Sequence, residues 1–177
     1  MSPELAQLRA LVRDIPDFPT PGIVFKDITP LLRDRAGLEL AIQGLAEKAA
    51  PLGIEYVVAA EARGFIMGAA LARELKAGFI PARRPGKLPY ETVRAEYALE
   101  YGYGALELHA DAISDGARIL VHDDLLATGG TAGALCELVE GLGGEVAACA
   151  FLIELSFLDG RDRLAPREVL SLIDYGD

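Results

Sequence analysis

The residues with the clearest chemical potential lie in the segment RILVHDDLLATGGTAGA, which spans residues 118–134. An apolar run ends in Asp123 and Asp124, and the tetrapeptide TGGT follows just before a segment with helical spacing. Glycines let the backbone curl with its N–H groups pointing inward, and threonines add hydroxyl donors. A helix N-terminus adds unpaired donors and the positive end of a dipole, so the segment predicts a monophosphate site that needs no lysine. The predicted phosphate-binding residues are Ala127, Thr128, Gly129, Gly130 and Thr131.

Asp123 and Asp124 would lie beside that phosphate. Carboxylates do not suit a phosphate, but they accept hydrogen bonds from the two hydroxyls of a ribose, and they also suit Mg²⁺. One short stretch could therefore bind a ribose 5-phosphate from end to end. Glycine-rich turns between a strand and a helix are common, and only the aspartate pair and the flanking elements make this one specific. The chain contains no GxxxxGK[ST] loop and no GxGxxG after a strand.

The segment LVHDDLLATGGT resembles the phosphoribosyl diphosphate motif of the type I phosphoribosyltransferases, and in particular of the members that act on adenine. His122 departs from the motif, where an apolar residue is usual, and we expect it to be a side chain on a strand. The resemblance covers nearly the whole chain and implies transfer of the phosphoribosyl group from phosphoribosyl diphosphate to adenine, giving AMP and diphosphate. It also implies a homodimer and the cofactor Mg²⁺, held by the substrate and contacted at most by Asp123 or Asp124.

Three basic residues are candidates for binding the diphosphate. Arg63 lies in EARGFIMG, which resembles the family's diphosphate-binding loop, with Ala62 in place of a small polar residue. A guanidinium group binds phosphate oxygens in a fork, so we expect Arg63 to hold the leaving group and to act in catalysis. Arg84 and Lys87 match the family pattern RxGKLP in a local basic cluster, whereas Arg83 is expected at the solvated surface.

The segment PTPGIVFKDITPLL resembles the adenine-binding segment of the family. The resemblance implies that Phe25 stacks on the purine and that the backbone of Val24 and Lys26 pairs with the edge of adenine. One N–H and one C=O would read the acceptor and donor of adenine and mismatch hypoxanthine. Phe25 could equally be a core residue, because buried phenylalanines are common. Leu155, in FLIEL, would pack on the base.

The segment YALEYG matches the part of the family that carries the proposed catalytic acid-base. This implies that Glu100 is the acid-base and that Tyr101 lies beside it in the substrate site. Without the resemblance, Glu100 would be one of many exposed carboxylates. The polar residues 83–104 that surround it are expected to form a lid loop, because long loops without apolar periodicity often do.

Strands and helices are expected to alternate, which predicts an α/β fold of the type I phosphoribosyltransferase kind: a mainly parallel twisted sheet flanked by helices. One domain of residues 1–177 would include a small hood over residues 1–35 and the lid, and residues 15–22 would be an extended proline-rich loop. The carboxyl ends of parallel strands meet at one edge, where ligands bind. Helices are expected near residues 3–13, 38–50, 64–76, 130–142 and 159–164. Strands are expected near residues 23–25, 54–60, 78–82, 105–109, 118–122, 146–155 and 169–173.

Composition narrows the class of protein. The chain has a formal net charge of -10 and a pI near 4.7, which argues against general nucleic-acid or membrane binding. Cys136 and Cys149 lie in apolar segments outside any CxxC motif, so they are expected to be buried free thiols. The sequence shows no secretory signal and no apolar run of membrane-spanning length, and we expect a cytoplasmic protein.

Three other functions remain open from the sequence. A transferase for guanine or xanthine is disfavoured by the segment PGIVFKD. A transcriptional regulator that senses phosphoribosyl diphosphate would need a basic recognition helix, and none is present in this acidic chain. A nucleotide-binding domain without chemistry would account for the phosphate loop but not for the other matches. Product formation with each base would separate these alternatives.

Overall fold

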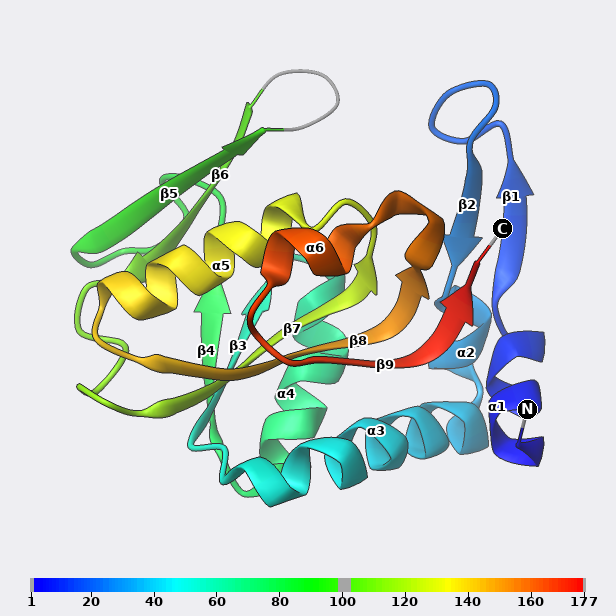
Figure 1. The fold of residues 1–177 in the computed structure, drawn as a ribbon, viewed down its shortest axis with the longest axis horizontal. Coiled ribbons are helices and arrows are strands. Elements are labelled where there is room, and N and C mark those ends of the chain that lie inside the picture. Colours follow the sequence, from blue (N-terminus) through cyan, green and yellow to red (C-terminus); the bar gives the residue numbers. More distant parts are fainter. Residues whose placement is uncertain (1, 99–102, 177) are drawn as a thin grey trace.

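The protein is described by a computed structural model that covers residues 2–98 and 103–176. Its centre is a five-stranded parallel sheet in the order β4-β3-β7-β8-β9, as Figure 1 shows. This confirms the predicted α/β fold with a parallel sheet. The strands of the sheet are β3 (Tyr56–Ala60), β4 (Gly78–Ala82), β7 (Arg118–Leu126), β8 (Glu145–Leu155) and β9 (Val169–Tyr175).

Helices cover both faces of this sheet (Figure 1). One face carries α3 (Arg35–Ala49) and α4 (Arg63–Leu75), and the other carries α5 (Gly130–Gly141) and α6 (Gly160–Leu164). The strands are apolar on both sides because each side is covered. In β3, for example, Val57 packs in the core under α3 and α4, whereas Val58 packs in the core under α5. The remaining helical segments are α1 (Pro3–Ala10), α2 (Thr29–Arg33), η1 (Ala50–Leu52) and η2 (Ser156–Leu158).

Two antiparallel ribbons stand outside the central sheet, at opposite ends of the view in Figure 1. The first pairs β1 (Arg13–Pro16) with β2 (Val24–Asp27), and the second pairs β5 (Thr92–Ala98) with β6 (Tyr103–His109). The second ribbon packs along α5 and contacts the core beneath it. Each ribbon therefore carries a segment that the sequence assigned to substrate binding or to the lid.

The prediction of a long loop over residues 83–104 was wrong for residues 92–98, which form β5, and for residues 103 and 104, which begin β6. Val93, Ala95 and Tyr97 alternate with exposed polar residues in β5 and pack against the core under α5. This is the period of a strand with one covered face. The alternation was not recognised in the sequence because the residues between these three are polar and no typical tight-turn sequence follows them.

Other elements differ in smaller ways from the predictions. The proline-rich residues 15–22 begin inside β1, because Ile15 and Pro16 pair with Phe25 and Val24. Pro16 ends a strand of a two-stranded ribbon, a place where a missing N–H is tolerated. The short helix α2 was not expected, and β7 continues four residues beyond the predicted end. The other predicted elements are present, with ends that differ by a few residues.

In the part of the chain that the structure describes, every helix is too short or too polar to cross a lipid bilayer.

Candidate active site

The glycine-rich turn connects β7 to the first turn of α5. Because β7 extends to Leu126, Asp123 and Asp124 lie within the strand rather than in the loop after it. Gly129 has a φ of 78°, in the left-handed region that favours glycine, and α5 starts at Gly130 without a side-chain cap from the described residues. The first N–H groups of α5 therefore remain available for an anion.

The two aspartates form a close pair at the carboxyl edge of the sheet. Asp124 is 2% exposed, and its backbone N–H donates a 2.9 Å hydrogen bond to Oδ1 of Asp123. Burial and the neighbouring Asp124 carboxylate raise the pKa of Asp123 well above its ordinary value. Burial also raises the pKa of Asp124, although the Arg63 guanidinium opposes this. Both groups therefore gain from a hydrogen-bond donor or a cation placed beside them.

Asp123→Asn is expected to stabilise the free protein at neutral pH. Because the pKa of Asp123 is raised in the folded state, ionisation weakens folding, and stability falls as the pH rises through that pKa. Asparagine keeps the acceptor oxygen but cannot ionise. The Tm of the variant should match that of the parent near pH 4 and exceed it by about 2–4 °C at pH 8. Differential scanning calorimetry across this range tests the expectation, and a Tm difference independent of pH would contradict it.

Arg63 connects the aspartate pair to the base-binding ribbon. Arg63 is the first residue of α4, and its Nε lies 3.0 Å from Oδ2 of Asp124, in an ion pair rather than an aligned hydrogen bond. Its guanidinium carbon lies 5.1 Å from the centroid of the Phe25 ring, within the range of a cation–π contact. The structure thus brings together Arg63, Asp124 and Phe25, which were predicted from the sequence to contact the leaving group, the sugar and the base, respectively.

Sequence reasoning missed the role of Glu61. This residue follows β3 directly, its side chain is only 7% exposed, and its carboxylate accepts hydrogen bonds from two arginines. Arg84 Nε donates to Oε1 at 2.6 Å and Arg83 Nε donates to Oε2 at 2.8 Å. Burial alone would raise the pKa of Glu61, but the hydrogen bonds from both arginines outweigh it and lower the pKa. The sequence did offer one signal, since Glu61 opens the segment EARGFIMG, which was predicted to bind the diphosphate.

The basic cluster is arranged differently from the prediction. Arg83, expected at the solvated surface, is held by Glu61, and its Nη1 donates to the backbone oxygen of Lys87 at 3.2 Å. Arg84 also pairs with Glu61 but remains 76% exposed, so its remaining donors can reach a ligand. Lys87 is exposed. Arg83 and Arg84 therefore flank Glu61, which lies two residues before Arg63 at the start of α4.

The base-binding candidates lie on the β1–β2 ribbon and at the end of β8. Phe25 is half-buried and contacts Phe18 edge to face, with ring centroids 5.2 Å apart, while Val24 is 48% exposed. The Lys26 side chain turns back to Asp14, with Nζ 2.8 Å from its carboxylate, so only the backbone of Lys26 remains for a base. Leu155 is the last residue of β8 and is partly buried against the core under α3 and α4.

His122 is a strand residue, as expected, and lies fully inside the protein. Its Nδ1 is 2.8 Å from the backbone oxygen of Ala150, and burial lowers the pKa of the ring to about 4. The ring is therefore neutral at pH 7 and donates its Nδ1 proton to that carbonyl oxygen. Glu100 and Tyr101, the predicted acid-base and its neighbour, lie outside the described residues.

The site offers few protein ligands for a metal ion. Among residues 2–98 and 103–176, no group of three or more His, Cys, Asp and Glu side chains is placed to hold one. Asp123 and Asp124 fit Mg²⁺ in type, because they are hard oxygen donors, and Oδ2 of Asp124 is buried without an aligned hydrogen bond. Most of the coordination of such an ion would therefore have to come from the substrate and water.

Comparison with known proteins agrees with this geometry. A family model described as phosphoribosyl transferase domain matches residues 33–173. The chain is 56% identical to an adenine phosphoribosyltransferase of Rubrobacter xylanophilus, over 96% of this chain and 92% of the relative. It is 58% identical to an adenine phosphoribosyltransferase of Methylococcus capsulatus, over 96% of this chain and 99% of the relative.

Solved structures show the same similarity in three dimensions. The crystal structure of adenine phosphoribosyltransferase from Thermoanaerobacter pseudethanolicus superimposes with a TM-score of 0.94 at 50% identity, covering 97% of this chain and 99% of that one. The Saccharomyces cerevisiae enzyme, complexed with an imino-altritol bisphosphate and adenine, gives 0.91 at 36% identity, with the same shares covered.

Proposed function

We propose a role for each site residue on the premise that the chain belongs to the adenine phosphoribosyltransferases, within the type I phosphoribosyltransferase family. The enzyme transfers the 5-phosphoribosyl group of phosphoribosyl diphosphate to adenine and yields AMP and diphosphate, a reaction of purine salvage. The observation that carries the assignment of roles is the glycine-rich turn, which joins half-buried Asp123 and buried Asp124 to the N-terminus of α5.

The 5-phosphate binds at residues 127–131. The free N–H groups at the start of α5 and the hydroxyls of Thr128 and Thr131 supply donors. Asp123 and Asp124 accept hydrogen bonds from the ribose hydroxyls, and Oδ2 of Asp124 is buried without an aligned hydrogen-bond donor in the free protein. The order of these groups along the chain supports this arrangement, since the aspartates of β7 and the turn after it follow one another within a few residues.

The diphosphate is held by Arg63, Arg84 and Lys87. As the bond from C1 of ribose to the leaving oxygen breaks, negative charge accumulates on the diphosphate, and cations fixed there stabilise the transition state more than the ground state. In the free protein Arg63 is paired with Asp124, and Arg84 with Glu61. Binding of the diphosphate therefore exchanges one anionic partner of Arg63 for another.

Magnesium is the proposed cofactor, held by the substrate and contacted at most by Asp123 or Asp124. When bound, Mg²⁺ supplies positive charge to the diphosphate oxygens and strengthens it as a leaving group.

Adenine binds between the β1–β2 ribbon and Leu155. Phe25 stacks on the purine, and the backbone of Val24 and Lys26 reads its edge. The proximity of Phe25 to Arg63, 5.1 Å away, supports this placement, because it sets the base pocket beside the leaving group. Adenine attacks through N9, and Glu100 accepts the proton from the imidazole ring. Tyr101 lies beside the substrate, and closure of residues 83–104 as a lid excludes water that would hydrolyse the sugar.

The test is product formation from phosphoribosyl diphosphate and Mg²⁺ with adenine, hypoxanthine, guanine or xanthine, each supplied separately. Formation of AMP from adenine, with no nucleotide from the other bases, supports the proposal that the backbone of Val24 and Lys26 recognises adenine. Nucleotide from hypoxanthine at a similar rate would refute it. Absence of product from every base, with phosphoribosyl diphosphate still bound, would overturn the assignment of catalysis to this site.

Phe25→Ala is expected to weaken adenine binding selectively. Removal of an aromatic ring that stacks on a base costs about 1–3 kcal/mol, so KM for adenine should rise by about 5- to 150-fold. KM for phosphoribosyl diphosphate should change little. Initial rates with each substrate varied in turn measure both constants. Phe79 offers a matched control, because it also contacts another phenylalanine edge to face, with centroids 5.7 Å apart, but away from the base ribbon. Equal effects from Phe25→Ala and Phe79→Ala would point to a core role for Phe25.

The wider organisation is proposed from the same family. Residues 1–177 form one domain, with a hood over residues 1–35 and the lid over residues 83–104, and two copies form a homodimer. Light scattering on the purified protein tests the dimer. A cytoplasmic location is consistent with Cys136 and Cys149, which are buried free thiols, since disulfides are rare in that compartment.

A further inference from the structure

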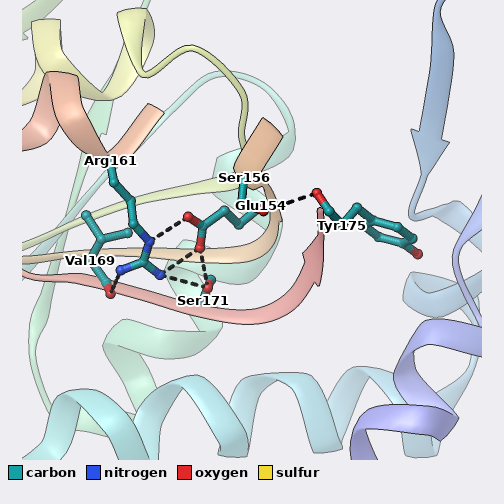
Figure 2. A network of polar contacts seen from close by, with 6 residues as sticks. All are labelled: Glu154, Ser156, Arg161, Val169, Ser171 and Tyr175. Carbon is teal, nitrogen blue, oxygen red and sulfur yellow. Dashed lines mark hydrogen bonds and ion pairs between the residues drawn. The ribbon is translucent and has the colours of Figure 1, made fainter. Parts of the chain in front are cut away.

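A polar network centred on the buried carboxylate of Glu154 lies at the carboxyl end of β8 (Figure 2). The side chain of Glu154 is 4% exposed, and both of its carboxylate oxygens accept hydrogen bonds from Arg161 of α6. Arg161 Nε is 2.5 Å from Oε1, and its Nη2 is 2.7 Å from Oε2. Ser171 of β9 donates a further hydrogen bond of 2.6 Å to Oε2. Figure 2 shows the guanidinium facing the carboxylate as a two-pronged pair.

Arg161 ties α6 to two strands of the sheet. Besides the bonds to Glu154 on β8, its Nη1 donates to the backbone oxygen of Val169 on β9 at 3.0 Å. Burial would raise the pKa of Glu154, but the hydrogen bonds from Arg161 and Ser171 outweigh it, so the pKa is lowered and the carboxylate is charged at neutral pH. The network is therefore a charged, bidentate connection between α6 and the sheet.

The helix that Arg161 holds cannot position itself. It comprises five residues, Gly160–Leu164, and follows Asp159, whose φ is 52° and whose side chain makes no capping hydrogen bond. Helices this short are unstable in isolation and take their position from tertiary contacts. Leu164, which is buried under α5, and the Arg161–Glu154 pair provide those contacts.

The first residue of α6 lies directly against the phosphate loop. A Cβ atom at Gly160 would collide with the backbone oxygen of Ala127, and one at Gly129 would lie 2.7 Å from the backbone oxygen of Gly160. The two backbones are therefore in van der Waals contact on both sides of the turn. Because Gly160 precedes Arg161, any shift of the arginine moves the surface on which Ala127 and Gly129 rest.

We propose that Glu154 and Arg161 are positioning residues that set the geometry of the loop over residues 127–131. This inference rests on the proposed binding of the 5-phosphate by that loop. The Arg161 side chain is 49% exposed, and such a partly exposed ion pair contributes little net stability, so stability alone gives a weak reason for this one. Precise placement of a phosphate site is a stronger reason, since a displacement of about 1 Å in a binding group can lower the rate by about 100-fold.

Glu154→Gln tests the proposal because it keeps the size of the side chain and removes the charge that holds Arg161. It should weaken inhibition by ribose 5-phosphate, and lower kcat/KM for phosphoribosyl diphosphate, by about 10- to 100-fold. Inhibition by diphosphate with Mg²⁺ should change by less than about twofold, since that ligand binds elsewhere in the site. A purely structural role would weaken both inhibitors alike, or neither, and either pattern would overturn the proposal.

A matched control comes from Glu140, which accepts two hydrogen bonds of 2.7 Å from Arg167 near the other end of α5. Glu140→Gln removes the same kind of pair without touching the phosphate loop and should leave both inhibition constants unchanged. Arg161→Lys keeps the charge but loses the bidentate guanidinium. It should likewise weaken inhibition by ribose 5-phosphate and leave inhibition by diphosphate nearly unchanged. Should Glu154→Gln fail to fold by circular dichroism, Arg161→Lys decides the question by the same criterion.

Thr131→Val separates failure of this inference from failure of the proposed function. It removes one proposed phosphate donor at constant shape. If it weakens ribose 5-phosphate while Glu154→Gln does not, the phosphate site stands and the positioning role is refuted. If neither variant affects ribose 5-phosphate, the phosphate lies elsewhere and both proposals fall.

Discussion

Asp124→Asn is expected to lower kcat/KM for phosphoribosyl diphosphate by about 10- to 100-fold, the equivalent of about 1.5–3 kcal/mol for hydrogen bonds to a charged acceptor. Asp124 is nearly inaccessible in the free protein and has Arg63 as its ionic partner. Asparagine preserves the shape but offers the ribose hydroxyls one neutral acceptor in place of a carboxylate. It also leaves Arg63 without its anionic partner, so the free enzyme changes as well as the complex.

Steady-state kinetics with varied phosphoribosyl diphosphate at saturating adenine measures this effect. Glu145→Gln is the matched control, because Glu145 pairs with Arg118 at 2.6 Å at the opposite, amino edge of the same sheet. That exposed pair contributes little, and the control should keep the parental kcat/KM within about twofold. An Asp124→Asn enzyme with the parental kcat and KM would show that this carboxylate does not bind the sugar.

Glu100→Gln is expected to lower kcat by about 10²- to 10⁴-fold, the range for loss of a general acid-base, with a much smaller change in either KM. The amide keeps the size of the side chain but cannot accept the proton that leaves the imidazole ring of adenine. The expectation depends on the match of YALEYG to the family, because Glu100 lies outside the described residues.

Single-turnover measurements separate the chemical step from product release, which can limit kcat in enzymes with a closing lid. Glu96→Gln is the control, since Glu96 lies nearby in the sequence, is exposed and pairs with Arg94 of the same strand, β5, at 2.8 Å. Its kcat should stay close to the parental value. A raised KM with unchanged kcat in Glu100→Gln would show that Glu100 anchors the lid and does not transfer the proton.

The ion pairs of the free protein suggest how the site changes on binding. Arg63 is held by Asp124 and Arg84 by Glu61, so two of the proposed diphosphate ligands already have carboxylate partners. Such pairs keep buried carboxylates from being left without a cation before substrate arrives. Phosphoribosyl diphosphate offers hydroxyls to the aspartates and phosphate oxygens to the arginines, and it can therefore replace the internal partners of both.

Some residues could not be placed from the sequence because their contacts depend on distant segments. Glu61 meets Arg83 and Arg84 only because β3 and β4 are neighbours in the sheet, with Ala60 opposite Ala82. Strand β5 was taken for part of a loop because its apolar side chains are recognisable as a buried face only when α5 packs against them. Lys26 was assigned to the base, but the fold adds Asp14 as a partner of its side chain.

The sequence by itself determined the glycine-rich turn, the aspartate pair and the alternation of strands with helices. These features are local: a strand, two carboxylates, a glycine-rich turn and a helix start follow each other within residues 118–134, and chain geometry alone places them together. The tertiary structure decided which groups partner them. Arg63 reaches Asp124, and Gly160 rests against Ala127, because sheet order and helix packing join segments far apart in the chain, and residue spacing does not encode such contacts.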